Sequence, residues 1–242
     1  MGKKYKKPPI VEALCEFRFV PSLAMDITIF GLFYGTIRDE FPTKQMELSA
    51  GVAAAQPKVV VPEYKIEPRT RFCNKDNTSI VQLGADWLTV NQLRPYPGWK
   101  EFKALILKVL ERYIAVASPK GFRQIVLRYL NTFDLPDTDT ALAEHFTYYP
   151  LAPATLLHTN TRFQLSIEVP YESERDLLRL SLATIIAEKP GLVSYLLDIG
   201  YLMVVPEHIG LSDVSGWLEG AHATVEKTFE ASITDRCRSH FE

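Results

Sequence analysis

GWKEFKALILKVLERYIAVAS, residues 98–118, and GWLEGAHATVEKTFEASITDRC, residues 216–237, begin with the nearly identical letters GWKE and GWLE. In each stretch apolar residues recur every three or four positions, which is the spacing of one face of an amphipathic helix. The two stripes are Trp99, Phe102, Ile106, Val109, Leu110 and Tyr113, and Trp217, Ala221, Val225, Phe229 and Ile233. The pattern predicts two long helices about half a chain length apart, the second running to the C-terminus.

The likeness extends upstream of both helices. LGADWLTV (residues 83–90) and LDIGYLMV (residues 197–204) share the pattern L-x-x-x-aromatic-L-x-V at the end of an expected strand. Glycine lets the chain turn sharply out of that strand. Tryptophan in the first helical turn covers the end of the sheet, a burial worth about 2–3 kcal/mol. Two motifs in the same order indicate an internal duplication.

The first half of the chain predicts strands around one further helix. Apolar and polar residues alternate over residues 8–21, which indicates a strand with one buried and one wet face. A helix is expected at residues 25–42, and one or two strands lie within residues 45–67. Residues 70–93 predict a hairpin with its turn at residues 75–77.

The second half predicts similar elements in the same order. A strand is expected at residues 122–136, a short helix at residues 140–146 and another strand at residues 163–171. Residues 175–205 predict a hairpin with its turn at residues 188–191. The second long helix then closes the chain.

These elements predict an α+β fold built from two related halves, residues 1–121 and residues 122–242, that together form one pseudo-twofold unit. Each half consists of a strand, a helix, antiparallel strands and a long helix. Either two antiparallel sheets or one continuous sheet would carry the helices on one face. The arrangement is similar to TATA-binding-protein-like and helix-grip folds, and a fold does not fix a function.

The net charge of −2 conceals an asymmetry between the halves. Residues 1–121 carry 18 Lys and Arg against 12 Asp and Glu, whereas residues 122–242 carry 9 against 17. The basic half could face an anionic partner, the two halves could attract each other within one chain or between copies in a homo-oligomer, or the charges could only solvate the surface.

Cysteine usage and hydropathy indicate a cytoplasmic protein. The three cysteines are far apart in the sequence, and an odd number argues against a disulfide framework. The basic start, residues 1–9, lacks the apolar stretch of a secretory signal. No apolar run reaches the length of a membrane span, since the longest candidate, residues 194–205, is short and contains Asp198.

The familiar signatures of catalysis are missing from the sequence. No HxxxH, HxH, HExxH or CxxC pattern points to a metal, and no GxxxxGK[ST], GxGxxG or GxSxG motif points to a nucleotide loop or a nucleophile elbow. We therefore expect no metal, no cofactor and no assignable catalytic residue.

Polar residues inside strands are the better candidates for a site. The set consists of Glu12, Glu16, Asn91, Arg128 and Asn131. Arg128 and Asn131 cannot share one face of a regular strand, because three positions separate them. An inward Arg128 needs a carboxylate, which Glu12 or Glu16 could supply if the first strands of the two halves pair. A structural ion pair and an anion-binding site both remain open.

Nucleic-acid binding is an alternative for the basic half. The candidate residues are Lys3, Lys4, Lys6, Lys7, Arg69 and Arg71. Tyr5, Tyr64 and Phe72 could stack on bases. The pI of about 6.2 is far below that of most domains with this function.

Four stretches together resemble a sporadically distributed family of uncharacterised bacterial and archaeal proteins of similar length. They are KKYKKPPIVEALCEFRF (residues 3–19), LTVNQLRPYPGWKEF (88–102), LRYLN (127–131) and FEASITDRCRSHF (229–241). The PP[IV]xEAxxxF start and the YPGW segment are the most specific parts. The resemblance implies one full-length unit, identifies no catalytic residue, and suggests accessory genes such as defence or toxin–antitoxin systems.

The sequence thus predicts a non-enzymatic cytoplasmic binding protein whose sheet face, or the groove between its halves, holds a protein partner or a small ligand. Nucleic-acid binding through the basic half is one alternative. An enzyme whose unfamiliar site contains Glu12, Glu16, Arg128 and Asn131 is the other.

Overall fold

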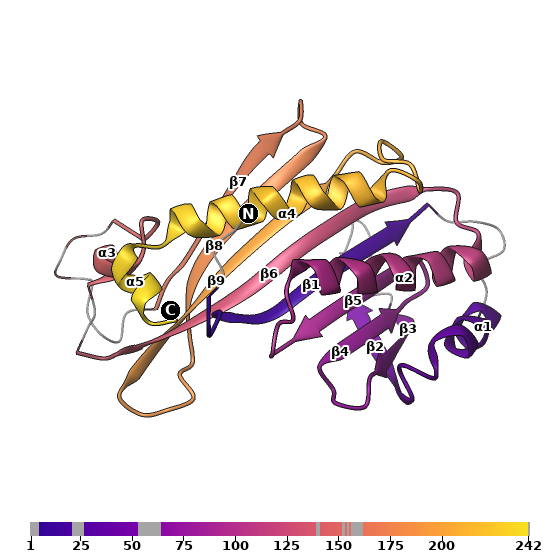
Figure 1. Ribbon diagram of the computed structural model, residues 1–242, viewed down its shortest axis with the longest axis horizontal. Helices are drawn as coiled ribbons and strands as arrows, with labels where there is room; N and C mark the ends of the chain where they lie inside the picture. Colours follow the sequence, from indigo (N-terminus) through magenta and orange to yellow (C-terminus); the bar gives the residue numbers. More distant parts are fainter. Residues whose placement is uncertain are drawn as a thin grey trace.

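Nine strands and five helices make up the described part of the chain. The computed structural model in Figure 1 describes residues 5–20, 27–52, 64–138, 141–151, 153, 155 and 162–241. The strands are β1 (Ile10–Phe19), β2 (Thr43–Val52), β3 (Tyr64–Cys73), β4 (Ser79–Leu83), β5 (Trp87–Leu93), β6 (Phe122–Pro136), β7 (Gln164–Tyr171), β8 (Asp176–Ile185) and β9 (Leu192–Met203). The helices are α1 (Thr28–Ile37), α2 (Trp99–Ala117), α3 (Leu142–His145), α4 (Val214–Ser232) and α5 (Asp235–Ser239).

All nine strands belong to one antiparallel sheet in a mixed α+β fold. Their order across the sheet is β2-β3-β4-β5-β1-β6-β9-β8-β7. The first strands of the two halves, β1 and β6, are therefore the central pair, and Cys15 of β1 lies opposite Leu127 of β6. Of the two arrangements left open by the sequence, the strands adopt the single continuous sheet.

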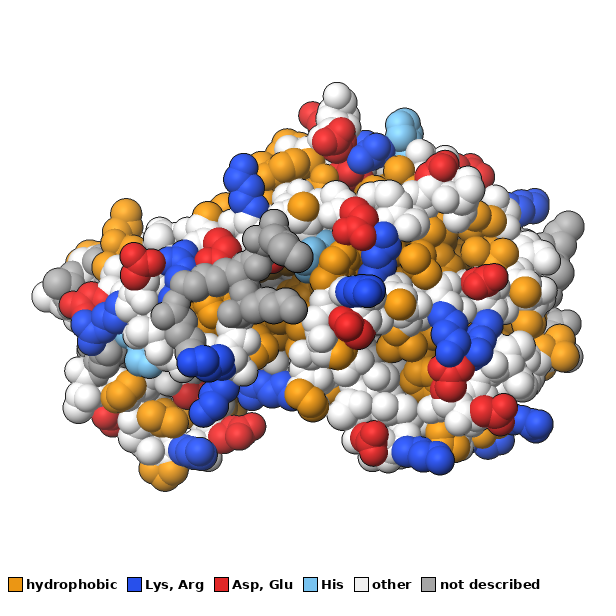
Figure 2. All heavy atoms as spheres, in the orientation of Figure 1, with side chains coloured by type: hydrophobic (Ala, Val, Ile, Leu, Met, Phe, Trp, Pro, Cys, Tyr) orange, Lys and Arg blue, Asp and Glu red, His pale blue; other side chains and the backbone are white. Residues whose placement is uncertain are grey.

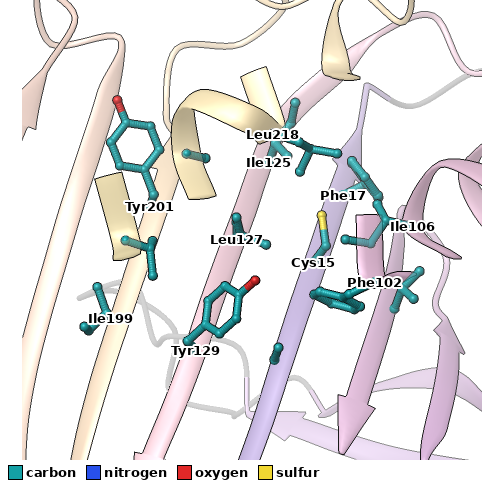
Figure 3. Packing of buried hydrophobic residues seen from close by; sticks show 14 of the residues in the cluster. Cys15, Phe17, Phe102, Ile106, Ile125, Leu127, Tyr129, Ile199, Tyr201 and Leu218 are labelled. Carbon is teal, nitrogen blue, oxygen red and sulfur yellow. The ribbon is translucent and has the colours of Figure 1, made fainter. Parts of the chain in front are cut away.

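The long helices cover one face of this sheet. In Figure 1, α2 and α4 lie in front of the strands. Figure 3 shows Cys15, Leu127 and Tyr129 on the side of the sheet where α2 contributes Phe102 and α4 contributes Leu218. Cys15, Leu127, Phe102 and Leu218 are fully buried. The alternation of the β1 sequence places its small and aromatic residues under the helices and its charged residues on the other face.

The shorter helices pack against the same layer. Phe33 of α1 contacts Phe72 of β3 and Tyr113 of α2 through edge-on ring contacts. Phe241, just beyond α5, packs against Phe133 of β6, with ring centroids 6.1 Å apart. Aromatic side chains therefore join every layer of the core, as the aromatic-rich composition favours.

The two GW motifs do not occupy equivalent positions. Gly98 precedes α2 with φ 111°, a conformation that favours glycine, and Trp99 is the first residue of the helix. Gly216 instead lies inside α4, which begins at Val214, and a Cβ there would meet no atom within 4 Å. The sharp turn expected at both glycines therefore exists only at Gly98.

The second long helix ends before the C-terminus, contrary to the prediction. Helix α4 stops at Ser232, and Ile233 adopts an extended conformation and pairs with Phe146 in an isolated bridge. Thr234 then caps α5 by accepting the backbone N–H of Cys237 at 3.2 Å. A β-branched residue followed by a capping threonine favours this break.

The predicted hairpins differ in detail. The turn of residues 188–191 lies in the connection between β8 and β9, as predicted, and Gly191 adopts φ 76°. Residues 70–93, expected to form one hairpin, belong to three strands, because the chain turns a second time between Leu83 and Trp87.

Charges of both signs intermingle over the helical side of the molecule. Figure 2 shows blue and red side chains scattered on this side without a large area of one sign. Within the described ranges, no helix has both the length and the apolar character needed to cross a membrane. Cys15, Cys73 and Cys237 are buried free thiols.

Candidate functional site

The sheet face opposite the helices carries a groove, here called the open-face groove, of about 540 Å³. Every described residue that lines it belongs to a strand. The lining consists of Leu14, Glu16, Arg18, Arg69, Gln82, Trp87, Thr89, Asn91, Gln124, Val126, Arg128, Arg179, Asp198, Gly200 and Leu202. The central β1–β6 pair contributes Leu14 and Val126 to a small apolar centre, and polar side chains surround it.

A chain of hydrogen bonds crosses four strands on one side of the groove. Arg69 of β3 donates through Nη2 to Oε1 of Gln82. The Nε2 of Gln82 donates to Oδ1 of Asn91 at 2.8 Å, and the Nδ2 of Asn91 donates to Oε1 of Glu12 at 2.6 Å. Each amide accepts on one side and donates on the other, so the row of side chains is held in a fixed order.

Arg128 forms a two-pronged ion pair on the other side of the centre. Its Nε and Nη2 donate to Oδ1 and Oδ2 of Asp198 at 2.7 and 2.5 Å. The hydrogen bond to Asp198 is the main reason that the pKa of Arg128 is raised, and the nearby carboxylates of Glu12 and Glu16 add to the effect. The carboxylate that Arg128 needs thus comes from β9, although β1 and β6 do pair.

Two other arginines of the face are also matched with carboxylates. Arg18 donates through Nε to Oε1 of Glu16 at 2.7 Å. Arg179 donates through Nε to Oε1 of Glu168 on the edge strand β7 at 2.8 Å. The open face therefore presents compensated charges rather than a strong field of one sign.

Gly200 forms the floor between two of these arginines. It lies opposite Arg128 on β6 and opposite Arg179 on β8. Since neighbouring strands are about 4.8 Å apart, the two arginine backbones are separated by about 10 Å. A Cβ on Gly200 would meet Leu202 at 3.5 Å and Arg128 at 3.8 Å, which are ordinary contacts. Packing alone does not demand glycine here, and its small size keeps the groove deep.

Four of the five polar candidates from the sequence share the open face: Glu12, Glu16, Asn91 and Arg128. Asn131 lies on the helical face, buried, and its Nδ2 donates to the carbonyl oxygen of Leu197 at 3.2 Å. The separation from Arg128 follows from the two-residue repeat of a strand. Asn131 is therefore placed to satisfy the backbone of β9.

The basic candidates do not gather at one site. Lys3 and Lys4 lie outside the described residues. Lys6 and Lys7 line a different groove near the chain termini. Arg69 lines the open-face groove, and Arg71 lies opposite Gln82, on the open face of β3.

Sequence reasoning missed Gln82, Trp87, Arg179 and Gly200 as parts of the groove. One signal was available for Arg179, because it alternates with the buried Leu178 and Leu180 in β8. Asp198 was visible as the only charged residue in an apolar run. Gly200 offered no signal, because its importance depends on the neighbours that the sheet order gives it.

No protein-family model matches the chain. No curated protein matches it in sequence either.

The groove combines guanidinium, amide, carboxylate and hydroxyl side chains. Of the described residues that line it, none is a cysteine, histidine, serine or lysine. Elsewhere in the described ranges, no three His, Cys, Asp or Glu side chains form a group that could hold a metal ion. The chemistry present is that of guanidinium, amide and carboxylate hydrogen bonds around a small apolar centre.

Proposed function

We propose that the protein is a non-enzymatic cytoplasmic binding protein that holds an extended segment of a partner protein in the open-face groove. The observation that carries this proposal is the row of arginine, amide and carboxylate side chains on a sheet face that no described helix covers. These side chains are already fixed by mutual hydrogen bonds, so a partner would lose little free energy in ordering them.

The charges of the groove favour a protein segment over a nucleic acid. Arg18, Arg128 and Arg179 each have a carboxylate partner. A nucleic acid gains affinity when free lysine or arginine side chains neutralise its phosphates and release the counterions condensed on them. Arg18, Arg128 and Arg179 are already paired with carboxylates and are not free in this sense. A polypeptide with side chains of both signs complements such a face, and its apolar residues fit over Leu14, Val126 and Leu202.

The strand order supports the proposed internal duplication. Outward from the β1–β6 pair, β5 corresponds to β9, β4 to β8 and β3 to β7, and α2 and α4 follow β5 and β9 in sequence. The edge strand β2 has no counterpart among the described residues of the second half, so the symmetry is incomplete there. A TATA-binding-protein-like or helix-grip-like arrangement, with helices on one face and a partner on the other, agrees with this order.

Location and context are part of the same proposal. Three buried free thiols, Cys15, Cys73 and Cys237, suit a reducing compartment such as the cytoplasm. The resemblance of residues 3–19 and 88–102 to a sporadically distributed family supports an accessory role in a mobile or defence gene system.

Site-specific photo-crosslinking in cells of the native host tests the proposal. A photoreactive residue replaces Val126, in the centre of the groove, and in a control it replaces Ala223, which is exposed on α4. We expect one discrete protein adduct from position 126 and none from position 223. A nucleic-acid adduct at position 126, or the same adducts at both positions, contradicts the proposal.

The purified partner then allows a quantitative test. Gly200→Leu fills the floor of the groove, and Gly220→Leu adds the same side chain on the exposed surface of α4, where a Cβ meets no atom within 4 Å. We expect at least a tenfold loss of affinity for Gly200→Leu and less than a twofold change for Gly220→Leu, measured by calorimetry. Equal affinities for the two variants would remove the open-face groove as the site.

A further inference from the structure

A second groove, here called the terminal groove, lies where the beginning of the chain meets its end. Its volume is about 710 Å³. The described residues that line it are Tyr5, Lys6, Lys7, Pro8, Pro9, Ile10, Arg94, Pro95, Tyr96, Thr132, Phe133, Asp134, Leu135, His240 and Phe241. None of them lines the open-face groove, so this site does not depend on the function proposed above.

The walls of the terminal groove are tied together by hydrogen bonds. Arg94 donates through Nε to the carbonyl oxygen of Ile10 at 3.1 Å, and through Nη2 to the carbonyl oxygen of Pro9 and to Oγ1 of Thr132 at 3.2 and 3.0 Å. The backbone N–H of Lys7 donates to the carbonyl oxygen of Phe241 at 3.2 Å. Residues 7–10 are thereby fixed against β6 and the C-terminal segment, which gives the groove a defined shape.

Three cations of this groove have no anionic partner among the described residues. Lys6 and Lys7 are exposed and make no ion pair there, and Arg94 donates to the uncharged oxygens of Ile10, Pro9 and Thr132. The one carboxylate in the lining, Asp134, already accepts the hydroxyl of Ser194 at 2.5 Å. On the open face, by contrast, Arg18, Arg128 and Arg179 are each matched with a carboxylate. Uncompensated cations in a concave site attract an anion.

Apolar rings lie beside these cations. Tyr5 packs edge-on against Phe241, with ring centroids 4.8 Å apart. Tyr96 packs edge-on against Tyr129 at 5.8 Å, and Pro8 and Pro95 add apolar surface to the lining. Rings and prolines present faces on which a planar group can stack, while lysines and an arginine hold phosphate oxygens.

We propose that the terminal groove binds a phosphate-bearing ring compound of nucleotide size. Lys6, Lys7 and Arg94 hold the phosphate groups, and the wall of Tyr5, Tyr96 and the prolines contacts the ring. The volume lies within the range of about 300–1,000 Å³ that is usual for small-molecule sites, which suits one nucleotide and not a long strand.

Calorimetry of the full chain at low salt, with ATP as the probe, tests the proposal. The test variant combines Lys6→Ala and Lys7→Ala, two exposed residues whose removal leaves the described hydrogen bonds intact. The control combines Lys75→Ala and Lys189→Ala, two exposed loop lysines outside the groove, and thus removes the same charge. We expect ATP binding by the natural chain, at least a tenfold weaker affinity for the test variant and less than a twofold change for the control.

Two further probes decide what the groove recognises. Inorganic tripolyphosphate should bind at least tenfold more weakly than ATP, because it lacks the ring. In hydrogen exchange with ATP present, residues 5–10 and 94–96 should gain protection. The Gly200→Leu variant should bind ATP as the natural chain does, which keeps this test separate from that of the open-face groove.

Several results would overturn the proposal. They are no binding of ATP at millimolar concentration, equal binding of tripolyphosphate and ATP, equal losses in the test and control variants, and protection confined to other segments. A short single-stranded DNA that binds more than tenfold tighter than ATP would also overturn it, since the groove would then be part of a nucleic-acid surface.

Discussion

Trp217 donates its indole N–H to Oδ1 of Asp176 at 3.1 Å, and the Asp176 side chain is fully shielded from solvent. Arg175 and the hydroxyl of Tyr201 donate to the other carboxylate oxygen at 2.5 and 3.2 Å. A buried carboxylate with three donors is well satisfied. The contact fastens the first turn of α4 to the start of β8, so the second GW motif is an anchor in the core.

The first GW motif makes a weaker contact. Trp99 donates to Oε2 of Glu219 at 2.9 Å, near the surface, where Lys103 also binds the same carboxylate. We expect Trp217→Phe to lower the free energy of unfolding by about 1.5–3 kcal/mol, because the bond to a buried charge is lost. Trp99→Phe should cost less than about 1 kcal/mol. Urea denaturation of both variants measures the difference, and equal costs would contradict it.

Arg128 and Asp198 should respond unequally to truncation. The Arg128 side chain is 44% exposed, whereas that of Asp198 is 15% exposed. Removing the arginine leaves a largely buried carboxylate unpaired, at a cost of about 2 kcal/mol. Removing Asp198 leaves an arginine that water can solvate, at a cost of about 1 kcal/mol. Thermal or urea unfolding measures both losses. A larger loss of stability in Arg128→Ala than in Asp198→Ala supports a structural pair, and a larger loss in Asp198→Ala contradicts it.

The faces of individual elements could be predicted from the sequence, because each depends on local spacing. The alternation in β1 predicts that Glu12 and Glu16 lie on the other face of the strand from the buried Cys15 and Phe17. The apolar stripe from Phe102 to Tyr113 is the buried face of α2. The partner of Arg128 could not be predicted. Asp198 is 70 residues away, and only the pairing of β6 with β9 brings the two together.

The differences between the GW motifs also depend on tertiary contacts. The letters GWKE and GWLE do not reveal that one glycine precedes its helix and the other lies inside it. In the folded chain Trp217 reaches Asp176, whereas Trp99 stacks on His222 with ring centroids 4.1 Å apart. Local spacing predicts both helices, and the contacts of each first turn depend on residues far away in the sequence.

His222 should make the protein less stable in mild acid. Burial lowers the pKa of His222 from 6.5 to about 4, and the nearby carboxylate of Glu219 opposes this effect. Between these values the unfolded chain binds the proton and the folded chain does not, so stability is full above pH 6.5 and falls as the pH drops toward 4.

The size of this effect is reduced by the partial exposure of the His222 ring. We expect the natural chain to lose about 1 kcal/mol more than His222→Gln between pH 7 and pH 5. Denaturant titrations of both chains at each pH provide the comparison. An identical loss in the two chains would show that other groups, and not His222, govern the acid response.

Thr234 should stabilise the C-terminal segment that carries one wall of the terminal groove. Its hydroxyl accepts the N–H of Cys237 at 3.2 Å and donates to the carbonyl oxygen of Glu144. Loss of such a cap costs about 1 kcal/mol, so Thr234→Ala should speed hydrogen exchange in residues 235–241. Hydrogen exchange in residues 5–8 should also become faster, because the N–H of Lys7 donates to the carbonyl oxygen of Phe241.

A matched threonine separates capping from the mere loss of a hydroxyl. Thr224 lies within α4, and its Oγ1 donates to the carbonyl oxygen of Gly220 at 2.9 Å, a bond that adds little to helix stability. Thr224→Ala should therefore change stability by less than about 0.5 kcal/mol. If Thr234→Ala loosens α5 without affecting residues 5–8, the two chain ends are held independently. If both segments loosen together, the cap of a five-residue helix governs the shape of the terminal groove.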